Sequence, residues 1–305
     1  METKNRLVMK FGGTSVGSAE AIIQAADRIE EQVREWDHVV VVVSAMSGVT
    51  DALLKSSSQA VKGDIRLFGP VIDDLHKKHY KESNALIKQR EERIILQRKI
   101  DRFLDDLAAY CRSIHIMGEV TPRGLDTITS FGERMNARVV AAALRQRGIN
   151  SLAVDATELI VTDGTYQNAV PLMEETREKV KQKLIPLLED GVTPVVTGFI
   201  GASKEGITTT LGRGGSDYTS AIMGDCLDAD EVWTLTDVDG VLTADPRIVP
   251  EARVIPELSY SAVGELAYFG AKVLHPKTIR PVIARDIPLW VKNTFNPDCP
   301  GTRIS

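Results

Sequence analysis

An unbroken run of valines is the feature that most limits how this chain can fold. Val39–Val43 presents apolar side chains at every position, so a strand formed there is buried on both of its faces. Strands of this kind belong to parallel sheets whose two faces are covered by helices. Other short apolar runs fit the same sheet. The full set of expected strands is 7–11, 38–45, 151–155, 193–200, 231–236 and 287–291.

Stretches with helical spacing lie between these runs. Two apolar stripes at helical intervals are Ile22, Ala26, Ile29 and Val33, and Leu172, Val180, Leu184 and Leu188. Both predict amphipathic helices that cross over between strands. The alternation therefore predicts an α/β protein with a mainly parallel sheet. A chain of 305 residues that is 43% apolar is long enough to form one large core or two abutting lobes.

Residues 64–117 interrupt this alternation. The segment is rich in charge, has no strand-like run and carries one apolar helical stripe, which consists of Ile100, Phe103, Leu107, Cys111 and Ile114. We expect a helical hairpin inserted into the sheet topology. A coiled-coil partner site is the alternative, but apolar heptad positions are not sustained far enough to favour it.

Composition excludes several classes of function. The formal net charge is -5 and the isoelectric point is near 5.7, so no basic face is expected for nucleic acid. The three cysteines, Cys111, Cys226 and Cys299, are scattered, which indicates reduced thiols and neither a disulfide framework nor a zinc site. The residues before the first strand lack the apolar run of a signal peptide or membrane span. We therefore expect a cytoplasmic protein without a membrane segment.

The first glycine-rich segment follows the first strand directly. Lys10 precedes Gly12 and Gly13, and a helix is expected shortly after them. Glycines allow backbone N–H groups to approach a phosphate, and a helix start adds partial positive charge. Because the lysine precedes the glycines, the segment is neither a Walker A loop nor a dinucleotide fingerprint. The segment fits a phosphate site that Lys10 reaches from the strand. An ordinary tight turn with a solvated lysine fits it equally well.

The second glycine-rich segment covers residues 208–218. Three glycines surround Arg213, and Ser216 and Asp217 follow. The segment therefore combines a flexible backbone, a guanidinium that binds anions in a bidentate manner and a carboxylate. Ser216 or Asp217 as a simple helix cap is the alternative. That alternative leaves Arg213 unexplained, so we favour a ligand site.

Further candidates follow other strands. Thr236 and Asp237 begin a TDVDG segment at a strand end, where ligands of open α/β sheets collect. Ser44 and Thr50 follow the valine strand, and Glu133 lies in an expected helix. Each is weak evidence alone, because turns, helix caps or a solvated Glu133–Arg134 pair explain them too. Together they predict a nucleotide cleft, with positive charge from lysine and arginine and with Glu133 as a partner for an ammonium group.

These segments together resemble the amino-acid kinase family, and its aspartate-specific branch most closely. The matching motifs run through nearly the whole chain, in the order KFGGTS at 10–15, SAMSGVTD at 44–51, FGER at 131–134, GRGGSDY at 212–218, TDVDG at 236–240, DPR at 245–247 and FGAKVLHP at 269–276. The resemblance implies an open α/β/α sandwich of the amino-acid kinase fold. Residues 1–200 would form the lobe that binds the amino acid, and residues 201–305 the lobe that binds ATP.

The resemblance also implies an activity and a set of roles. The γ-phosphate of ATP, accompanied by Mg²⁺, would pass to the side-chain carboxylate of L-aspartate and give 4-phospho-L-aspartate, the first step toward lysine, threonine and methionine. The catalytic residues would be Lys10 and Asp217. The substrate would be bound by Ser44, Thr50, Glu133, Arg213 and Ser216. The ATP site would comprise Lys10, Phe11, Gly12, Gly13, Thr236, Asp237, Leu242, Arg247, Lys272 and Val273. No metal ligand is expected from the protein itself.

The chain departs from the family pattern in two respects. Leu242 stands where family members often carry an aromatic residue near the nucleotide. The chain ends at Ser305, about where a catalytic domain would end, so we expect no regulatory domains of the ACT type and no inhibition by lysine or threonine. Because family members commonly pair, the resemblance implies a homodimer.

Three alternative functions compete with this interpretation. A related kinase that acts on acetylglutamate, glutamate or carbamate is the nearest, and the motifs at 44–51, 131–134 and 212–218 favour aspartate over it. A non-catalytic binding regulator has little need of Lys10, Arg213 and Asp217 together. A dinucleotide-dependent oxidoreductase lacks the required glycine spacing.

Overall fold

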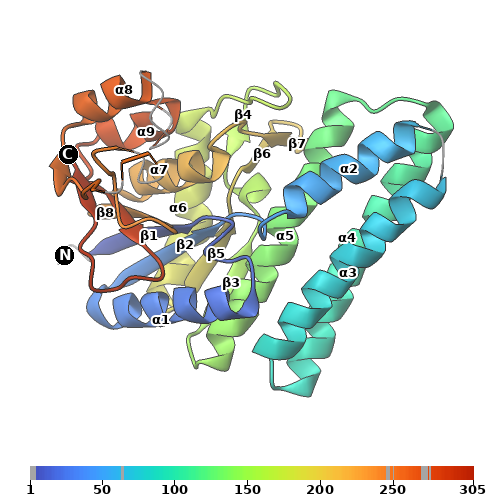
Figure 1. Ribbon diagram of the computed structural model, residues 1–305, viewed down its shortest axis with the longest axis horizontal. Coiled ribbons are helices and arrows are strands. Elements are labelled where there is room, and N and C mark those ends of the chain that lie inside the picture. The colour runs from blue at the N-terminus through green and yellow to red at the C-terminus, as the bar shows by residue number, and fades with distance from the viewer. Residues whose placement is uncertain (1–4, 63–64, 245–247, 250, 269–273, 275) are drawn as a thin grey trace.

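The valine strand lies inside the larger of two sheets. The computed structural model describes residues 5–62, 65–244, 248–249, 251–268, 274 and 276–305. The larger sheet has the strand order β3-β5-β2-β1-β8-β10-β11-β9, and every pairing in it is parallel except the one between β10 and β11 (Figure 1). Its strands are β1 (Arg6–Phe11), β2 (His38–Val43), β3 (Ser151–Val154), β5 (Thr193–Thr197), β8 (Glu231–Thr236), β9 (Glu257–Leu258), β10 (Leu289–Asn293) and β11 (Thr302–Ile304).

Two apolar cores lie on opposite faces of this sheet. Val39, Val41 and Val43 pack into one core, and Val40 and Val42 pack into the other, so the valine run is buried on both faces as the sequence predicts. The first core is covered by α1 (Ala19–Glu35) and α5 (Pro122–Gln146). The second is covered by α6 (Met173–Glu189), α7 (Gly215–Leu227) and α9 (Pro276–Ile283), with α8 (Tyr260–Tyr268) beside α9. The predicted α/β sandwich with a mainly parallel sheet is confirmed.

The helical insertion is also confirmed. α3 (Ile65–Leu86) and α4 (Arg90–Met117) form a hairpin that projects with α2 (Val49–Val61) to one side of the sheet (Figure 1). The α4 stripe predicted from sequence packs within the molecule, and its buried members are Ile100, Leu107, Cys111 and Ile114. This packing leaves no need for a coiled-coil partner.

A small second sheet corrects one strand prediction. The run 193–200 was expected to be a single strand, but β5 ends at Thr197 and β6 (Ile200–Ser203) joins β4 (Val161–Thr162) and β7 (Thr208–Thr210). The chain turns between the two strands at Phe199, which has a left-handed backbone with φ 71°. The short helix η1 (Ala156–Glu158) packs against β6.

Among the described residues, no helix has both the length and the apolar character needed to cross a bilayer.

Candidate active site

The carboxyl ends of the central strands meet at one edge of the larger sheet. Phe11 at the end of β1 lies in register with Val43 of β2 and Leu235 of β8, and Val43 lies in register with Thr197 of β5. Backbone hydrogen bonds hold the residues that follow: Gly12 N–H donates to Leu235 O (3.1 Å), and Ser44 N–H donates to Phe11 O (3.2 Å). The loops after four different strands therefore share this edge, which is where open α/β sheets bind ligands.

A cavity of about 440 Å³ lies at this edge, within the size range of small-molecule sites. It joins residues that are far apart in the sequence. The predicted site residues that line it are Lys10, Gly13, Ser44, Thr50, Glu133, Arg213, Ser216 and Asp217. The catalytic and substrate-binding sets inferred from sequence are therefore brought together in one place.

Lys10 and Asp217 form an ion pair inside the cavity. Lys10 Nζ lies 2.6 Å from Asp217 Oδ1, and the Lys10 side chain is only 9% exposed. This geometry excludes a freely solvated lysine. Asp217 lies in the first turn of α7, but the N-cap residue of that helix is Gly214, and no side-chain hydrogen bond caps it. The helix-cap explanation of Asp217 is therefore wrong, and its carboxylate is directed to Lys10.

Two helices begin at the cavity. α7 follows Gly214 (φ 71°) and α2 follows Gly48 (φ 79°), and both glycines have the left-handed backbone that favours glycine. Neither N-cap supplies a side-chain acceptor, so N–H groups of the first turns are left for another partner. Helix N-termini carry partial positive charge and bind anions. Together with Lys10 and Arg213 they make this cavity suited to carboxylates and phosphates.

Glu133 places a buried acidic side chain in the same cavity. Its Oε1 accepts a hydrogen bond from Ala45 N–H (3.2 Å), while its buried Oε2 has no hydrogen-bond partner among the described residues. Burial raises the pKa of Glu133 to about 8, and the hydrogen bond from Ala45 opposes that shift. A buried carboxylate with one free oxygen is a favourable site for a cation, because a cation both satisfies the oxygen and stabilises the charge.

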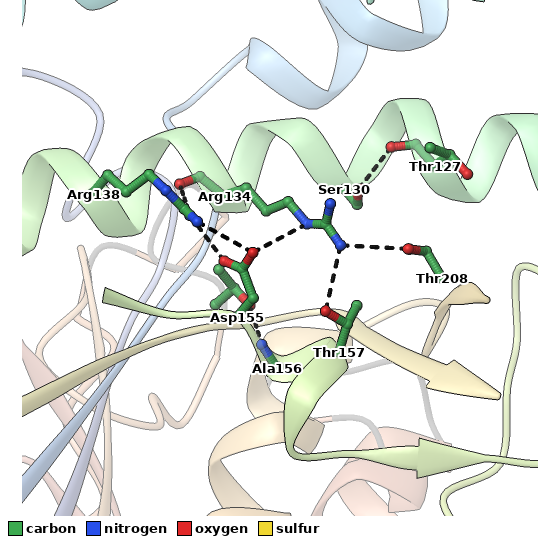
Figure 2. Close-up of polar contacts among 9 residues, drawn as sticks. Thr127, Ser130, Arg134, Arg138, Asp155, Ala156, Thr157 and Thr208 are labelled. Atoms are coloured by element: carbon green, nitrogen blue, oxygen red, sulfur yellow. Dashed lines mark hydrogen bonds and ion pairs between the residues drawn. The ribbon is translucent and has the colours of Figure 1, made fainter. Parts of the chain in front are cut away.

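Arg134, the neighbour of Glu133, is directed elsewhere. Figure 2 shows it reaching from α5 toward Asp155, Thr157 and Thr208, with Nε 3.7 Å from Asp155 Oδ2 and the Nη2 contacts to the threonine hydroxyls at 3.4 Å. Arg138, one turn later, binds both oxygens of Asp155 at 2.8 and 3.2 Å. The interpretation of Glu133–Arg134 as a solvated pair is therefore wrong. Glu133 lines the cavity, whereas Arg134 contacts Asp155 and the two threonines.

Of the residues predicted for ATP, Lys10 and Gly13 line this cavity, and the other described ones do not. Thr236 and Asp237 follow β8, and Thr236 Oγ1 donates to Asp237 Oδ1 (3.0 Å). Leu242 forms an isolated antiparallel bridge with Val254. The Phe11 side chain is fully buried in the core. Arg247, Lys272 and Val273 lie outside the described residues.

Sequence reasoning missed several residues at this edge. Asp51, Gly48 and Ser47 line the cavity from the loop after β2 and the start of α2, although all three lie within the SAMSGVTD motif. Phe199 also lines it and carried no recognisable signal, because a left-handed phenylalanine is set by tertiary packing. Near β8, Asp239 accepts hydrogen bonds from the side chain of Asn293 (2.7 Å).

A mainly parallel sheet with a charged cavity at the carboxyl ends of its central strands defines an α/β protein of the kind that binds small molecules at this edge. Residues 5–293 match the model of the amino acid kinase family, and the chain belongs to that family.

Similar proteins agree with this assignment. The chain is 39% identical to "Aspartokinase 1, chloroplastic" of Arabidopsis thaliana, over 98% of this chain and 52% of the relative. It is 40% identical to "Aspartokinase 3, chloroplastic" of the same plant, over 100% and 54%. The chain thus spans about half the length of these curated relatives.

Solved structures show the same similarity. The crystal structure of Escherichia coli aspartokinase III in complex with aspartate and ADP matches with a TM-score of 0.89 and 31% identity, over 98% of this chain and 64% of that one. A UMP kinase from Bacillus anthracis, at 14% identity and a TM-score of 0.55, shares the fold alone.

Proposed function

We propose that this chain is an aspartate kinase that transfers the γ-phosphate of ATP to the side-chain carboxylate of L-aspartate. The observation that carries the proposal is the meeting in one cavity of the buried carboxylate Glu133 with the cations Lys10 and Arg213. Aspartate has one ammonium and two carboxylate groups, so it needs a site with this mixture of charges. The relatives named aspartokinase support this choice over other amino acids.

Each part of the amino acid has a proposed partner. Glu133 Oε2 would accept a hydrogen bond from the ammonium group, and Arg213 would hold a carboxylate in a bidentate manner. Ser44, Thr50 and Ser216 would donate hydroxyl hydrogen bonds, because all three line the cavity. The helix starts at Gly48 and Gly214 would add N–H donors to the carboxylates.

The chemistry needs little from the protein beyond placement and charge. A carboxylate is already a nucleophile, so no general base is required. The barrier lies in bringing this anion against an anionic phosphate, which positioned cations lower. Lys10 would neutralise the phosphoryl group during transfer, and Asp217 would fix Lys10 Nζ through their 2.6 Å contact.

ATP would bind next to the amino acid, on the β8 side of the same edge. The end of β1 and the loop after it would face the phosphates, and they comprise Phe11, Gly12 and Gly13. The remaining residues would border the nucleotide, and they are Thr236, Asp237, Leu242, Arg247, Lys272 and Val273. Mg²⁺ would enter with ATP. It is usually held by phosphate oxygens, water and one or two carboxylates, so it requires no cage of protein ligands.

Other proposals follow from family resemblance and composition. They comprise an amino-acid lobe at 1–200, an ATP lobe at 201–305, a homodimer, a cytoplasmic location and a product that enters lysine, threonine and methionine synthesis. One eight-stranded sheet runs through both proposed lobes, since β1 pairs with both β2 and β8.

Product analysis tests the proposed activity. With ATP and Mg²⁺, we expect ADP release with aspartate and much slower release with glutamate or acetylglutamate. Hydroxylamine should trap the product as a hydroxamate, because acyl phosphates react with it. ADP release without a trapped hydroxamate, or equal rates with all three acids, would contradict the proposal.

The variant Lys10→Ala tests the role of the ion pair. We expect kcat to fall at least about 100-fold, because the main charge facing the phosphoryl group is lost. The circular dichroism spectrum should be unchanged. Near-normal turnover in this variant would refute phosphoryl stabilisation by Lys10.

A further inference from the structure

We propose that Asp126 is a positioning residue that fixes Arg213 at the correct separation from Glu133. This inference rests on the proposed binding of aspartate between those two side chains. Asp126 lies outside the cavity and outside every motif recognised in the sequence.

α5 carries both Asp126 and Glu133. They are seven residues apart, which is about two helical turns, so they project from the same side of the helix. Asp126 is almost fully buried, at 1% exposure. Its position relative to Glu133 is therefore set by a rigid helix, and whatever Asp126 binds is placed at a fixed distance from Glu133.

Asp126 binds the strand that leads to Arg213. Its Oδ2 accepts hydrogen bonds from Thr210 N–H (3.0 Å) and Gln167 N–H (2.9 Å), and its Oδ1 accepts one from Thr210 Oγ1 (2.8 Å). Thr210 is the last residue of β7, and Arg213 follows three residues later. One carboxylate thus anchors the end of β7 and the adjoining loop to α5.

The loop around Gln167 supports the same segment. Gly212 packs so tightly that a Cβ there would lie 2.9 Å from Asn168 Oδ1 and 3.1 Å from Gln167 O. Asp126 therefore holds Thr210, which lies two residues before Gly212. It also holds the loop at residues 167–168, against which Gly212 packs. At the other end of β7, Arg134 of the same helix contacts Thr208, as Figure 2 shows.

Arg213 depends on this anchoring because its side chain is not fixed otherwise. It is exposed, and within the described part of the chain it forms no ion pair or hydrogen bond. Its reach into the cavity is therefore set by its backbone. The contacts of Asp126 converge on the backbone that precedes Arg213, so their loss should act on the binding of the substrate carboxylate.

Steady-state kinetics of Asp126→Ala test the proposal. We expect KM for aspartate to rise about 10- to 100-fold, the range that misplacement of a binding group produces. KM for ATP should change less than about threefold, because the nucleotide contacts do not depend on β7. This split separates positioning of Arg213 from general loss of structure.

The conservative variant Asp126→Asn should retain the kinetic behaviour of the original protein. Its amide oxygen can accept from Thr210 N–H and Gln167 N–H, and its NH₂ group can donate to Thr210 Oγ1, which also acts as an acceptor. We expect KM for aspartate within about threefold of the original value. If Asp126→Ala does not fold, Thr210→Val, which removes the hydroxyl with little change in shape, should raise KM for aspartate about tenfold and leave KM for ATP unchanged.

Ser151→Ala is the matched control. Ser151 Oγ also forms a buried hydrogen bond with α5, at Ala141 O (2.8 Å), but does not contact β7. This variant should leave both KM values unchanged. Asp126→Ala or Thr210→Val with an unaltered KM for aspartate, or a parallel rise in both KM values, would overturn the proposal.

Hydrogen exchange of the ligand-free protein separates this inference from the proposed function. Asp126→Ala should speed amide exchange at 210–215, and Ser151→Ala should not. Faster exchange in a protein that does not phosphorylate aspartate would refute the function and keep the anchoring role. Aspartate phosphorylation with unchanged exchange at 210–215 would refute the anchoring role alone.

Discussion

At the scale of single residues, the charge state of Glu133 depends on what occupies the cavity. Without a ligand its burial disfavours the carboxylate, and the pKa of about 8 means that most of it is protonated at neutral pH. An ammonium group beside Oε2 would stabilise the ionised form. The cavity also holds Lys10, Arg213, Asp51 and Asp217, which contribute charges of both signs. Binding of the amino acid should therefore release a proton from Glu133.

This coupling predicts a pH dependence of aspartate use. Since the ligand-free protein must lose a proton from Glu133 before it pairs with an ammonium, kcat/KM for aspartate should rise with pH and level off near pH 8, the pKa of this group. The slope below that pH should approach about tenfold per unit. The measurement is kcat/KM for aspartate between pH 6 and 9 at saturating ATP. Glu133→Gln should give lower values and a flat profile, and an identical rise in this variant would contradict the assignment.

The same pKa shift has a consequence for stability. Because the folded pKa of Glu133 lies above its ordinary value of 4.5, the stability that its neutral form contributes is present below pH 4.5 and is lost as pH rises to about 8. Glu133→Gln stays neutral at every pH. Urea unfolding should therefore show this variant to be more stable than the original at pH 9, on the order of 5 kcal/mol, with a much smaller difference at pH 5.

At the scale of elements, burial on two faces made the central strands predictable, and tertiary contacts set the rest. β8 begins and ends at the predicted residues, and β2 differs only at its end. β10 was predicted at 287–291, but it begins at Leu289 and ends at Asn293, because Lys292 and Asn293 pair with Leu235 and Thr236 of β8. Such cross-strand pairing leaves no periodic signal in the sequence.

The helical insertion contacts the site, which its charge-rich sequence did not indicate. Glu82 of α3 is buried, and its Oε2 accepts a hydrogen bond from Ala19 N–H (2.6 Å) at the start of α1. Lys78, one turn earlier, donates to Ser47 O (2.9 Å) in the cavity wall. α3 therefore supports both the loop after β1 and the loop after β2.

This contact predicts a specific loss of stability. Glu82→Ala should leave Ala19 N–H unpaired and remove negative charge from a helix N-terminus, at a cost of about 1–3 kcal/mol in the free energy of unfolding. Urea unfolding measures it. Glu31→Ala is the control, because Glu31 forms a surface ion pair with Arg28 (2.9 Å) within α1. Loss of this exposed pair should cost less than about 0.5 kcal/mol. Equal losses in the two variants would contradict a buried cap.

At the scale of the whole molecule, the sequence predicted many of the residues that line the candidate site, but not all of the residues that line or support it. Eight residues chosen from motifs line one cavity, because parallel strands bring their following loops to a common edge. Asp126 was not predicted, since a single buried aspartate in a helix gives no local signal. Phe199 was missed because its left-handed backbone arises only where the chain passes from β5 in the larger sheet to β6 in the smaller one.

The position of the cavity predicts that ligands stabilise the molecule as a unit. Its lining includes Lys10 on β1, Glu133 on α5, which covers the first core, and Asp217 on α7, which covers the second. A bound amino acid would therefore bridge elements that pack on both cores. Aspartate at 100 times its Kd should add about 2.7 kcal/mol to the free energy of unfolding and raise Tm by several degrees.

Thermal unfolding with and without aspartate tests this expectation. Arg213→Ala should unfold at the original temperature in the absence of ligand, because the side chain is exposed and has no ion pair among the described residues. Its aspartate-induced shift should be much smaller, while a non-hydrolysable ATP analogue should stabilise both proteins equally. An unchanged aspartate shift in Arg213→Ala would show that the amino acid binds elsewhere, since no other cation of the cavity lies on the loop between β7 and α7.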